Sequence, residues 1–227
     1  MVNEVVEGAL APIRQETAPL RSRIIESMRR AIERGALRPG ERLVEKDLCQ
    51  QLGVSRTSLR EALRELEAEG VIAQAATRGL TVAKISRRDA ENIYRIRADV
   101  EALIVEQFIE VASEDQVAAL LQLNRELVDA YKRGDFVSIV EAKRAFYDHI
   151  CAVADNAIAL DLLSRLTLRT AQLRSRSVVR PERQAESIRE IERLGRAIHD
   201  RDIPAARQAA RAHVEHAAKS ALPFAAP

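Results

Sequence analysis

Aromatic residues, glycine and cysteine are scarce in this chain of 227 residues. Four Phe, three Tyr and no Trp are too few for the aromatic stacking surfaces that hold single-stranded nucleic acid. The two cysteines, Cys49 and Cys151, form no CxxC pair, which excludes a zinc ribbon and a dithiol redox motif. No uncharged apolar run is long enough to span a bilayer, and the N-terminal segment carries acids where a signal peptide carries basic residues. We therefore expect a soluble cytoplasmic protein.

The overall charge indicates no partner. Lys and Arg number 36 against 34 Asp and Glu, a net charge of +2, so any signal for nucleic acid must be local. The apolar fraction of 47% and the charged fraction of 31% are typical of a globular protein. At this length the chain forms one large domain or two small ones.

The first 84 residues predict three helices followed by a hairpin. Residues 19–35 show a helical face of Leu20, Ile24, Met28 and Ala31, and residues 44–52 predict a short helix that Gly53 ends. Ser55 is placed to cap a helix over 56–69. Two short apolar runs, 71–75 and 80–84, flank a turn at 76–79, which is typical of a β-hairpin. Helix-turn-helix plus hairpin predicts a winged helix.

The helix over 56–69 carries two different faces. Leu59, Leu63 and Leu66 form the apolar face, while arginines recur every four residues on another side, at Arg56, Arg60 and Arg64. An arginine ridge of this kind is usually a solvated surface paired with glutamates. Here it follows a glycine turn and a serine cap and precedes a hairpin, and that order favours a helix that reads double-stranded DNA.

Beyond residue 86 the pattern predicts an all-α bundle. Glycine is rare there, and six helices are expected at 87–111, 114–133, 135–154, 157–178, 182–201 and 203–220. The whole chain is therefore predicted as mainly α. It divides into an N-terminal tail (1–18), a winged helix-turn-helix domain (19–84), a linker (85–88), a helical domain (89–220) and a C-terminal tail (221–227).

Residues 19–84 resemble the winged-helix domain of the GntR family of bacterial transcription regulators. The resemblance rests on GALRPGERLVEKDL, LGVSRTSLREALRELEAEGVI and RGLTV, which occur in the family's order and spacing. It implies that the operator contacts come from the helix-turn-helix and the wing, at Lys46, Arg56, Thr57, Ser58, Arg60, Arg78 and Gly79. Lysine is a point charge, so a phosphate contact is expected at Lys46.

Residues 88–220 resemble the FCD effector domain of the FadR subfamily, of the VanR-like type with six helices. The matching segments are IYRIRADVEALIVEQ, AFYDHICAVADN and RAIHDRDIPAARQAARAHVEH. Many members of that subfamily hold a divalent metal with one aspartate and three histidines. The alignment places Lys143, Tyr147 and Ile191 at three of these positions, and only His213 matches. A lysine and an isoleucine are unsuitable ligands, so no metal is expected.

Lys143 is the only charge on the apolar stripe of the helix over 135–154. One interpretation is a lysine that reaches the surface or pairs with a carboxylate such as Glu101. The other is a clamp for a small anionic effector, in which Arg97 and Arg169 add guanidinium groups and Tyr147 and His213 add hydrogen bonds. His213 fits a packed core position equally well.

These features predict a homodimeric repressor that binds a palindromic operator and is released by a small anionic metabolite. An architectural DNA-binding protein with an inert dimerisation bundle is the alternative. An enzyme that uses Lys143 as a base or Schiff-base residue is disfavoured, because the chain shows neither a nucleophile with its base nor a phosphate loop.

Overall fold

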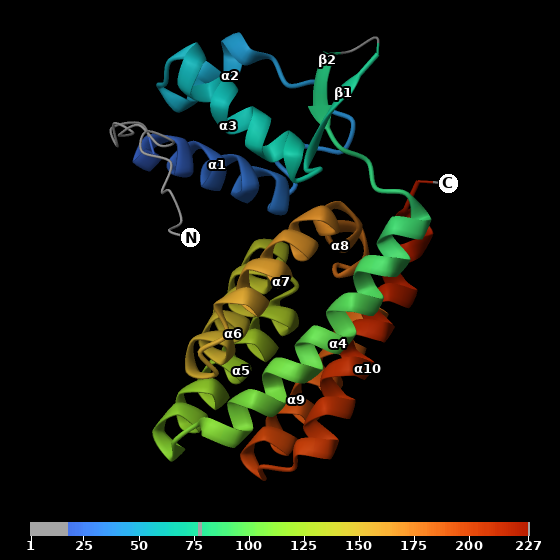
Figure 1. Cartoon of the computed structure of the whole chain (residues 1–227). Coiled ribbons are helices and arrows are strands. Elements are labelled where there is room, and N and C mark those ends of the chain that lie inside the picture. The colour runs from blue at the N-terminus through green and yellow to red at the C-terminus, as the bar shows by residue number, and fades with distance from the viewer. Residues whose placement is uncertain (1–17, 77–78, 227) are drawn as a thin grey trace, which may run out of the picture.

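The structure is a computed structural model that describes residues 18–76 and 79–226. A small N-terminal domain of helices and a two-stranded sheet lies at one end of a larger helical bundle (Figure 1). This confirms the mainly α fold with an N-terminal winged helix-turn-helix. In these two ranges no helix combines the length and the apolar character that a membrane crossing requires.

The N-terminal domain follows the order that the sequence predicts. It contains α1 (Ala18–Glu33), α2 (Glu45–Leu52), α3 (Arg56–Ala68), β1 (Ile72–Ala75) and β2 (Gly79–Val82). Gly53 ends α2 in the left-handed region, at a φ of 64°, which a side chain would strain. The Ser55 hydroxyl then accepts the Ser58 amide at 3.2 Å and caps α3. These two residues make the tight turn between α2 and α3.

One core joins the three N-terminal helices and the hairpin. Leu59, Leu63 and Leu66 are buried as predicted, with at most 3% of each side chain exposed. The face predicted for α1 was partly wrong, because Leu20 is 39% exposed whereas Ile25 and Ile32 are buried. The reason is that α1 packs against both α3 and the helical bundle, which turns its buried face toward these isoleucines.

The wing is a regular antiparallel hairpin. Its register pairs Ile72 with Val82 and Ala75 with Gly79. The segment before α2 adds to the same sheet, since the Leu43 amide donates to the Leu80 carbonyl at 2.8 Å. The predicted wing residue Arg78 lies outside the described residues.

The bundle contains seven α-helices in the described part of the chain. They are α4 (Arg87–Val111), α5 (Glu114–Arg133), α6 (Phe136–Val153), α7 (Ala157–Arg169), α8 (Ala171–Ser177), α9 (Pro181–His199) and α10 (Ile203–Ala221). The last helix packs against α4 and α9, and α5 packs against α6 and α9. The largest core cluster centres on residues such as Phe108, Phe146 and Ile198.

The single helix predicted over 157–178 was wrong, because the chain breaks at Thr170 into α7 and α8. The Thr170 hydroxyl donates to the carbonyls of Leu166 and Thr167, both at 3.2 Å, and competes with the helical backbone bonds. The break lies against the N-terminal domain: Leu168 is buried in that domain's core, and Nε2 of the Gln172 side chain donates to the Ala83 carbonyl at 2.8 Å. The two domains therefore meet at α7 and α8.

The ends of the helical domain follow the prediction in part. Helix α4 begins at Arg87, capped by Ser86, as the helix predicted over 87–111 does, so the expected linker of 85–88 overlaps its first turn. The residues predicted as a C-terminal tail form a 3-10 helix, Leu222–Phe224, and return to the start of α4. There the Ala226 amide donates to the Ile85 carbonyl at 3.1 Å. Apolar packing around Phe224 holds this segment against the bundle.

Candidate functional site

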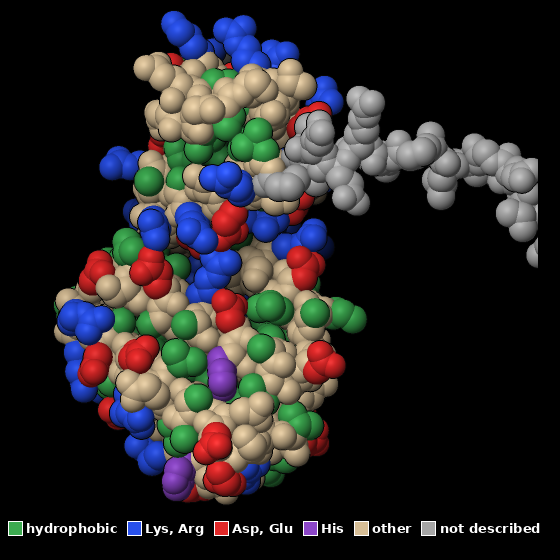
Figure 2. All heavy atoms as spheres, turned by 90° about the vertical axis from the view of Figure 1, so that its left-hand side faces the viewer, with side chains coloured by type: hydrophobic (Ala, Val, Ile, Leu, Met, Phe, Trp, Pro, Cys, Tyr) green, Lys and Arg blue, Asp and Glu red, His purple; other side chains and the backbone are tan. Residues whose placement is uncertain are grey.

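The arginine ridge of α3 lies on the surface. Arg56, Thr57, Arg60 and Arg64 are exposed, while the leucines behind them are buried in the small domain. Lys and Arg side chains also gather at the end of this domain that is farthest from the bundle (Figure 2). The N-terminal turn of α3 therefore presents cations and free backbone amides to solvent, an arrangement that suits a phosphate backbone.

Contacts within the helix-turn-helix orient two of the predicted DNA-binding residues. The Arg60 Nε lies 3.0 Å from both carboxylate oxygens of Glu45, in the first turn of α2. The hydrogen bond from Arg60 lowers the pKa of the Glu45 carboxyl. Ser58 is bound to the cap, with its hydroxyl 3.0 Å from the Ser55 hydroxyl. Lys46 is exposed beside Glu45, and Gly79 begins β2 at a φ of 70°.

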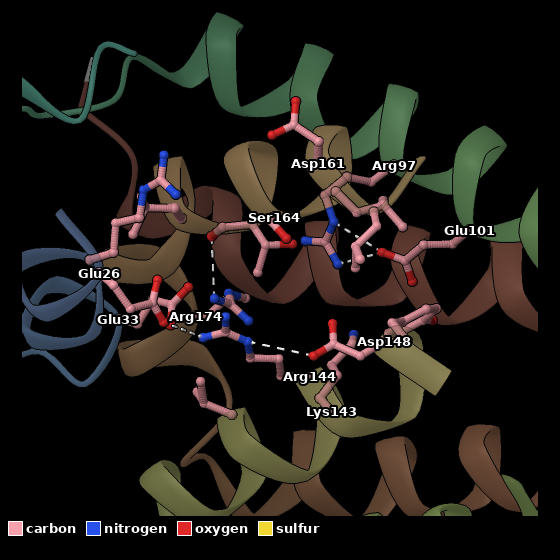
Figure 3. A pocket seen from close by; sticks show the side chains of 17 residues that line it. Glu26, Glu33, Arg97, Glu101, Lys143, Arg144, Asp148, Asp161, Ser164 and Arg174 are labelled. Atoms are coloured by element: carbon pink, nitrogen blue, oxygen red, sulfur yellow. Dashed lines mark hydrogen bonds and ion pairs between the residues drawn. The ribbon is translucent and has the colours of Figure 1, made fainter. Parts of the chain in front are cut away.

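A cavity of about 200 Å³ lies in the bundle where α4, α6, α7 and α8 meet α1 of the small domain (Figure 3). Arg97, Lys143, Tyr147 and Arg174 line it together with the carboxylate of Glu101. The two arginines are 1% and 7% exposed. Burial of so many charged groups requires that they satisfy one another or a ligand.

The buried arginines keep unused donors. Arg97 pairs with Glu101, with Nη2 at 2.6 Å and Nε at 3.0 Å from one carboxylate oxygen. Burial raises the pKa of Glu101, but Arg97 and Lys143 outweigh it and lower that pKa to about 2. The Arg97 Nη1 and Arg174 Nε atoms are buried and have no hydrogen-bond partner among the described residues. Free cationic donors beside a cavity are suited to bind an anion.

Lys143 belongs to a chain of polar contacts across the bundle. Its Nζ lies 3.0 Å from His213 Nε2, and His213 Nδ1 lies 2.8 Å from a Glu190 oxygen. Arg183 binds both oxygens of Glu190, at 2.9 and 2.8 Å. His213 therefore donates a hydrogen bond from Nδ1 to Glu190 and accepts a hydrogen bond at Nε2 from the Lys143 amine.

The buried site lowers the basicity of both residues. Burial lowers the pKa of Lys143 to about 7; attraction from Glu101 is offset by repulsion from neighbouring arginines. Burial and the charge of Lys143 lower the pKa of His213 to about 4, so its ring is neutral at pH 7. An anion in the cavity would favour the charged form of Lys143.

Two family models match the chain. The model described as the FCD domain matches residues 92–216, and that of bacterial regulatory proteins of the gntR family matches residues 20–82. The chain belongs to the GntR family. It is a DNA-binding transcriptional regulator with an FCD domain, and its relatives are regulators rather than enzymes.

Curated relatives agree with this assignment. The uncharacterized HTH-type transcriptional regulator YdhC of Bacillus subtilis is 27% identical over 190 residues, 83% of this chain and 85% of YdhC. McbR of Escherichia coli K12 is 33% identical over 135 residues, 60% of this chain and 61% of McbR. The HTH-type transcriptional repressor RspR of the same strain is 26% identical over 215 residues, 95% of this chain and 92% of RspR. A solved structure of E. coli McbR/YncC matches with a TM-score of 0.77 and 26% identity, over 87% of this chain and 94% of that one.

In this GntR-family protein the structure brings most of the predicted effector residues together. Arg97, Lys143 and Tyr147 line the cavity, and His213 contacts Lys143 from behind it. Arg169 does not join them: it ends α7 and its guanidinium lies beside Gly70 of the small domain. The helix break at Thr170 shifts the phase of the following residues, so Arg174 on α8 lines the cavity. No spacing rule in the sequence marks Arg174.

The residues at the FCD metal positions do not fit a metal. Among the described residues, no group of three or more His, Cys, Asp or Glu side chains is arranged to hold one. Ile191 is buried in an apolar cluster with Leu127 and Ile139. His213 is the remaining imidazole, and its Nε2 lone pair faces the Lys143 amine. The amine therefore occupies the direction in which a ligated metal would lie.

Replacing Arg56 or Arg60 with Ala is expected to weaken binding to operator fragments, selected from genomic DNA with the purified protein, by about 1–3 kcal/mol. Each change removes a guanidinium from the exposed face of α3 that is expected to contact DNA. Replacing Lys46 with Ala should weaken binding to all DNA sequences equally. It should also lower the slope of log affinity against log salt concentration by about one. Fluorescence anisotropy of labelled fragments measures both.

The matched control is Arg125→Ala, which removes an exposed arginine from α5 of the bundle. It should leave DNA affinity unchanged. Folded Arg56→Ala and Arg60→Ala proteins that bind as tightly as the wild type would show that α3 does not read the operator.

Proposed function

We propose that this GntR-family regulator is a cytoplasmic homodimeric repressor that binds a palindromic operator and is released by a small anionic metabolite in the cavity between α1, α4, α6, α7 and α8. RspR, which is named a repressor and is covered over 92% of its length, is the precedent for repression, while the Glc operon transcriptional activator of E. coli K12 is equally similar at 26% identity. Each protomer supplies one winged helix, so a two-fold dimer matches a site with two-fold symmetry.

The surface of α4 supports an assembly of two chains. Ile96 and Leu103 stand one heptad apart on this helix and are 45% and 44% exposed. Val100 between them is only partly buried. Apolar residues gathered on one helix face are typical of a surface that another protein covers. Dimerisation through α4 would leave the two α3 helices free for DNA.

The observation that carries the effector proposal is the pair of buried arginines, Arg97 and Arg174, which line the cavity and keep unused donors. Arg97, Lys143 and Arg174 line the cavity with one buried carboxylate, Glu101. In the part of the chain that the structure describes, Arg97 Nη1 and Arg174 Nε have no hydrogen-bond partner. Buried polar groups are nearly always satisfied, by protein or by a bound molecule. A carboxylate or phosphate group offers the several acceptor atoms that this wall needs.

We also propose that the site works without a metal, with the Lys143 amine in its place. Protein purified without a chelator is expected to contain far less than one equivalent of zinc, nickel or manganese by elemental analysis. One equivalent of any of these metals, lost in His213→Ala, would contradict this proposal and the alignment behind it.

Organic acids and phosphorylated metabolites should raise the melting temperature of the protein, because a ligand that binds the native state stabilises it. Replacing Lys143 with Met keeps a side chain of similar length and removes the charge. The variant is expected to lose at least tenfold in affinity for the best ligand of the wild type, as measured by calorimetry.

The control is Lys132→Met, which removes an exposed lysine on α5 that pairs with Asp129. This variant should bind like the wild type. A panel in which no anion stabilises the wild type would favour the architectural alternative. A ligand that Lys143→Met binds unchanged would place the effector elsewhere.

A further inference from the structure

The cavity is shared by both domains. Three of its lining residues, Glu26, Arg29 and Glu33, belong to α1 of the DNA-binding domain, and the others belong to the bundle. Figure 3 shows Glu26 and Glu33 on the α1 side, directed toward the arginines of the bundle. The two acids stand seven residues apart, two turns along one helix face. The DNA-binding domain therefore forms an acidic part of the cavity wall.

Glu26 is bound to a cavity arginine of the other domain. Arg144 Nη1 of α6 donates to Glu26 Oε1 at 3.1 Å, and Arg144 Nε lies 3.7 Å from Asp148. The pKa of Glu26 is lowered because the hydrogen bonds and charges of Arg30 and Arg144 outweigh the effect of burial. The charge of Glu33 also acts on Arg144 and Arg174. The carboxylates of α1 thus stand where the acceptors of an anionic ligand would stand.

This contact across the domains is open to competition. The side chains of Arg144 and Glu26 are 48% and 33% exposed. Partly exposed ion pairs contribute little stability, and a better acceptor can replace one partner without a large loss. A free anion is not restrained by the backbone of α1 and can approach Arg97 and Arg174 as well.

The helices that line the cavity also carry the other contacts between the domains. Thr167 and Arg174 line the cavity, and Leu168 and Gln172 on the same two helices hold the DNA-binding domain. The Arg174 guanidinium donates to the Thr167 carbonyl at 3.2 Å across the break at Thr170. A ligand that draws Arg174 toward itself would act on this break and on the contacts beside it.

We propose that Glu26 of α1 is a built-in competitor for the effector: an anionic ligand displaces it from Arg144 and so detaches the DNA-binding domain from this side of the bundle. The inference rests on the proposed effector site and adds how that site is coupled to DNA. By linkage, any contact that holds Glu26 on Arg144 weakens ligand binding, and removal of that contact strengthens it.

The test is calorimetry of the full chain with inorganic phosphate and with succinate as probes. Glu26→Gln removes the competing charge and keeps the shape of the side chain. It is expected to tighten binding of a probe about three- to fivefold, the range that a partly exposed ion pair supports. Circular dichroism and the melting temperature check that each variant is folded.

Two controls separate competition from simpler effects. Glu141→Gln breaks a second ion pair between the domains, with Arg34, outside the cavity lining. Asp161→Asn removes an acid that lines the cavity but pairs with Arg165 on its own helix. Both should bind the probes within about twofold of the wild type, because neither acid competes for Arg144.

The outcomes distinguish the two proposals. If the wild type binds a probe through Lys143 but Glu26→Gln binds no more tightly, or all three variants tighten alike, the competition is refuted and the effector site stands. If neither probe binds the wild type, or Lys143→Met binds as well, the effector site itself is refuted and this inference with it.

Release is measured separately by hydrogen exchange. Saturating probe should speed amide exchange in α7 and α8 around Thr170 in the wild type, while Glu26→Gln should exchange faster before any probe is added. Bound probe with unchanged exchange in this segment would refute the release step.

Discussion

The buried charges of the bundle constrain the rest of the structure. Arg97 and Glu101 lie on α4, Lys143 on α6, Glu190 on α9 and His213 on α10, and each is nearly or partly removed from water. An unpaired charge in such a place costs several kcal/mol, so these four helices must hold their polar groups in register. Burial raises the pKa of Glu190, but hydrogen bonds from His213 and Arg183 hold that pKa well below its usual range. Among the described residues, the network leaves Arg97 Nη1 and Arg174 Nε, and also Glu101 Oε2, buried without a hydrogen-bond partner beside the cavity.

The two domains have separate cores and a shared boundary. Within the DNA-binding domain, Ser55, Gly53 and the buried leucines of α3 help to orient that helix. The domain's position on the bundle depends on Leu168 and Gln172, which the break at Thr170 presents. The cavity adjoins this same break. In the proposed mechanism, a small movement of α7 and α8 changes the placement of α3 without any change inside the winged helix.

The winged helix was predictable because its signals are local. Caps, left-handed glycines and apolar spacing act within a few residues, and α2, α3 and the hairpin follow them closely. The helical bundle was less predictable from the sequence. Nothing in the sequence around Thr170 resembles a helix stop, since neither Gly nor Pro is near. The break occurs where the Thr170 hydroxyl bonds back to the carbonyls of Leu166 and Thr167, next to the other domain. That single break placed Arg174 in the cavity and Arg169 outside it. The contacts of Glu26 with Arg144 join residues 118 apart, and no spacing rule reaches so far.

Nuclear magnetic resonance of the Lys143 side chain, labelled at Cε, tests the central claim most directly. The amine faces Glu101, Arg97, Arg174, Arg183 and His213, and burial among them lowers its pKa to about 7. A bound anion stabilises the ammonium, so the titration midpoint should lie near 7 in the free protein and move upward when the cavity holds phosphate or an organic acid. A midpoint that stays at the ordinary 10.5, or one that a bound anion leaves unchanged, would contradict the claim that Lys143 is a buried binding group for an anionic ligand.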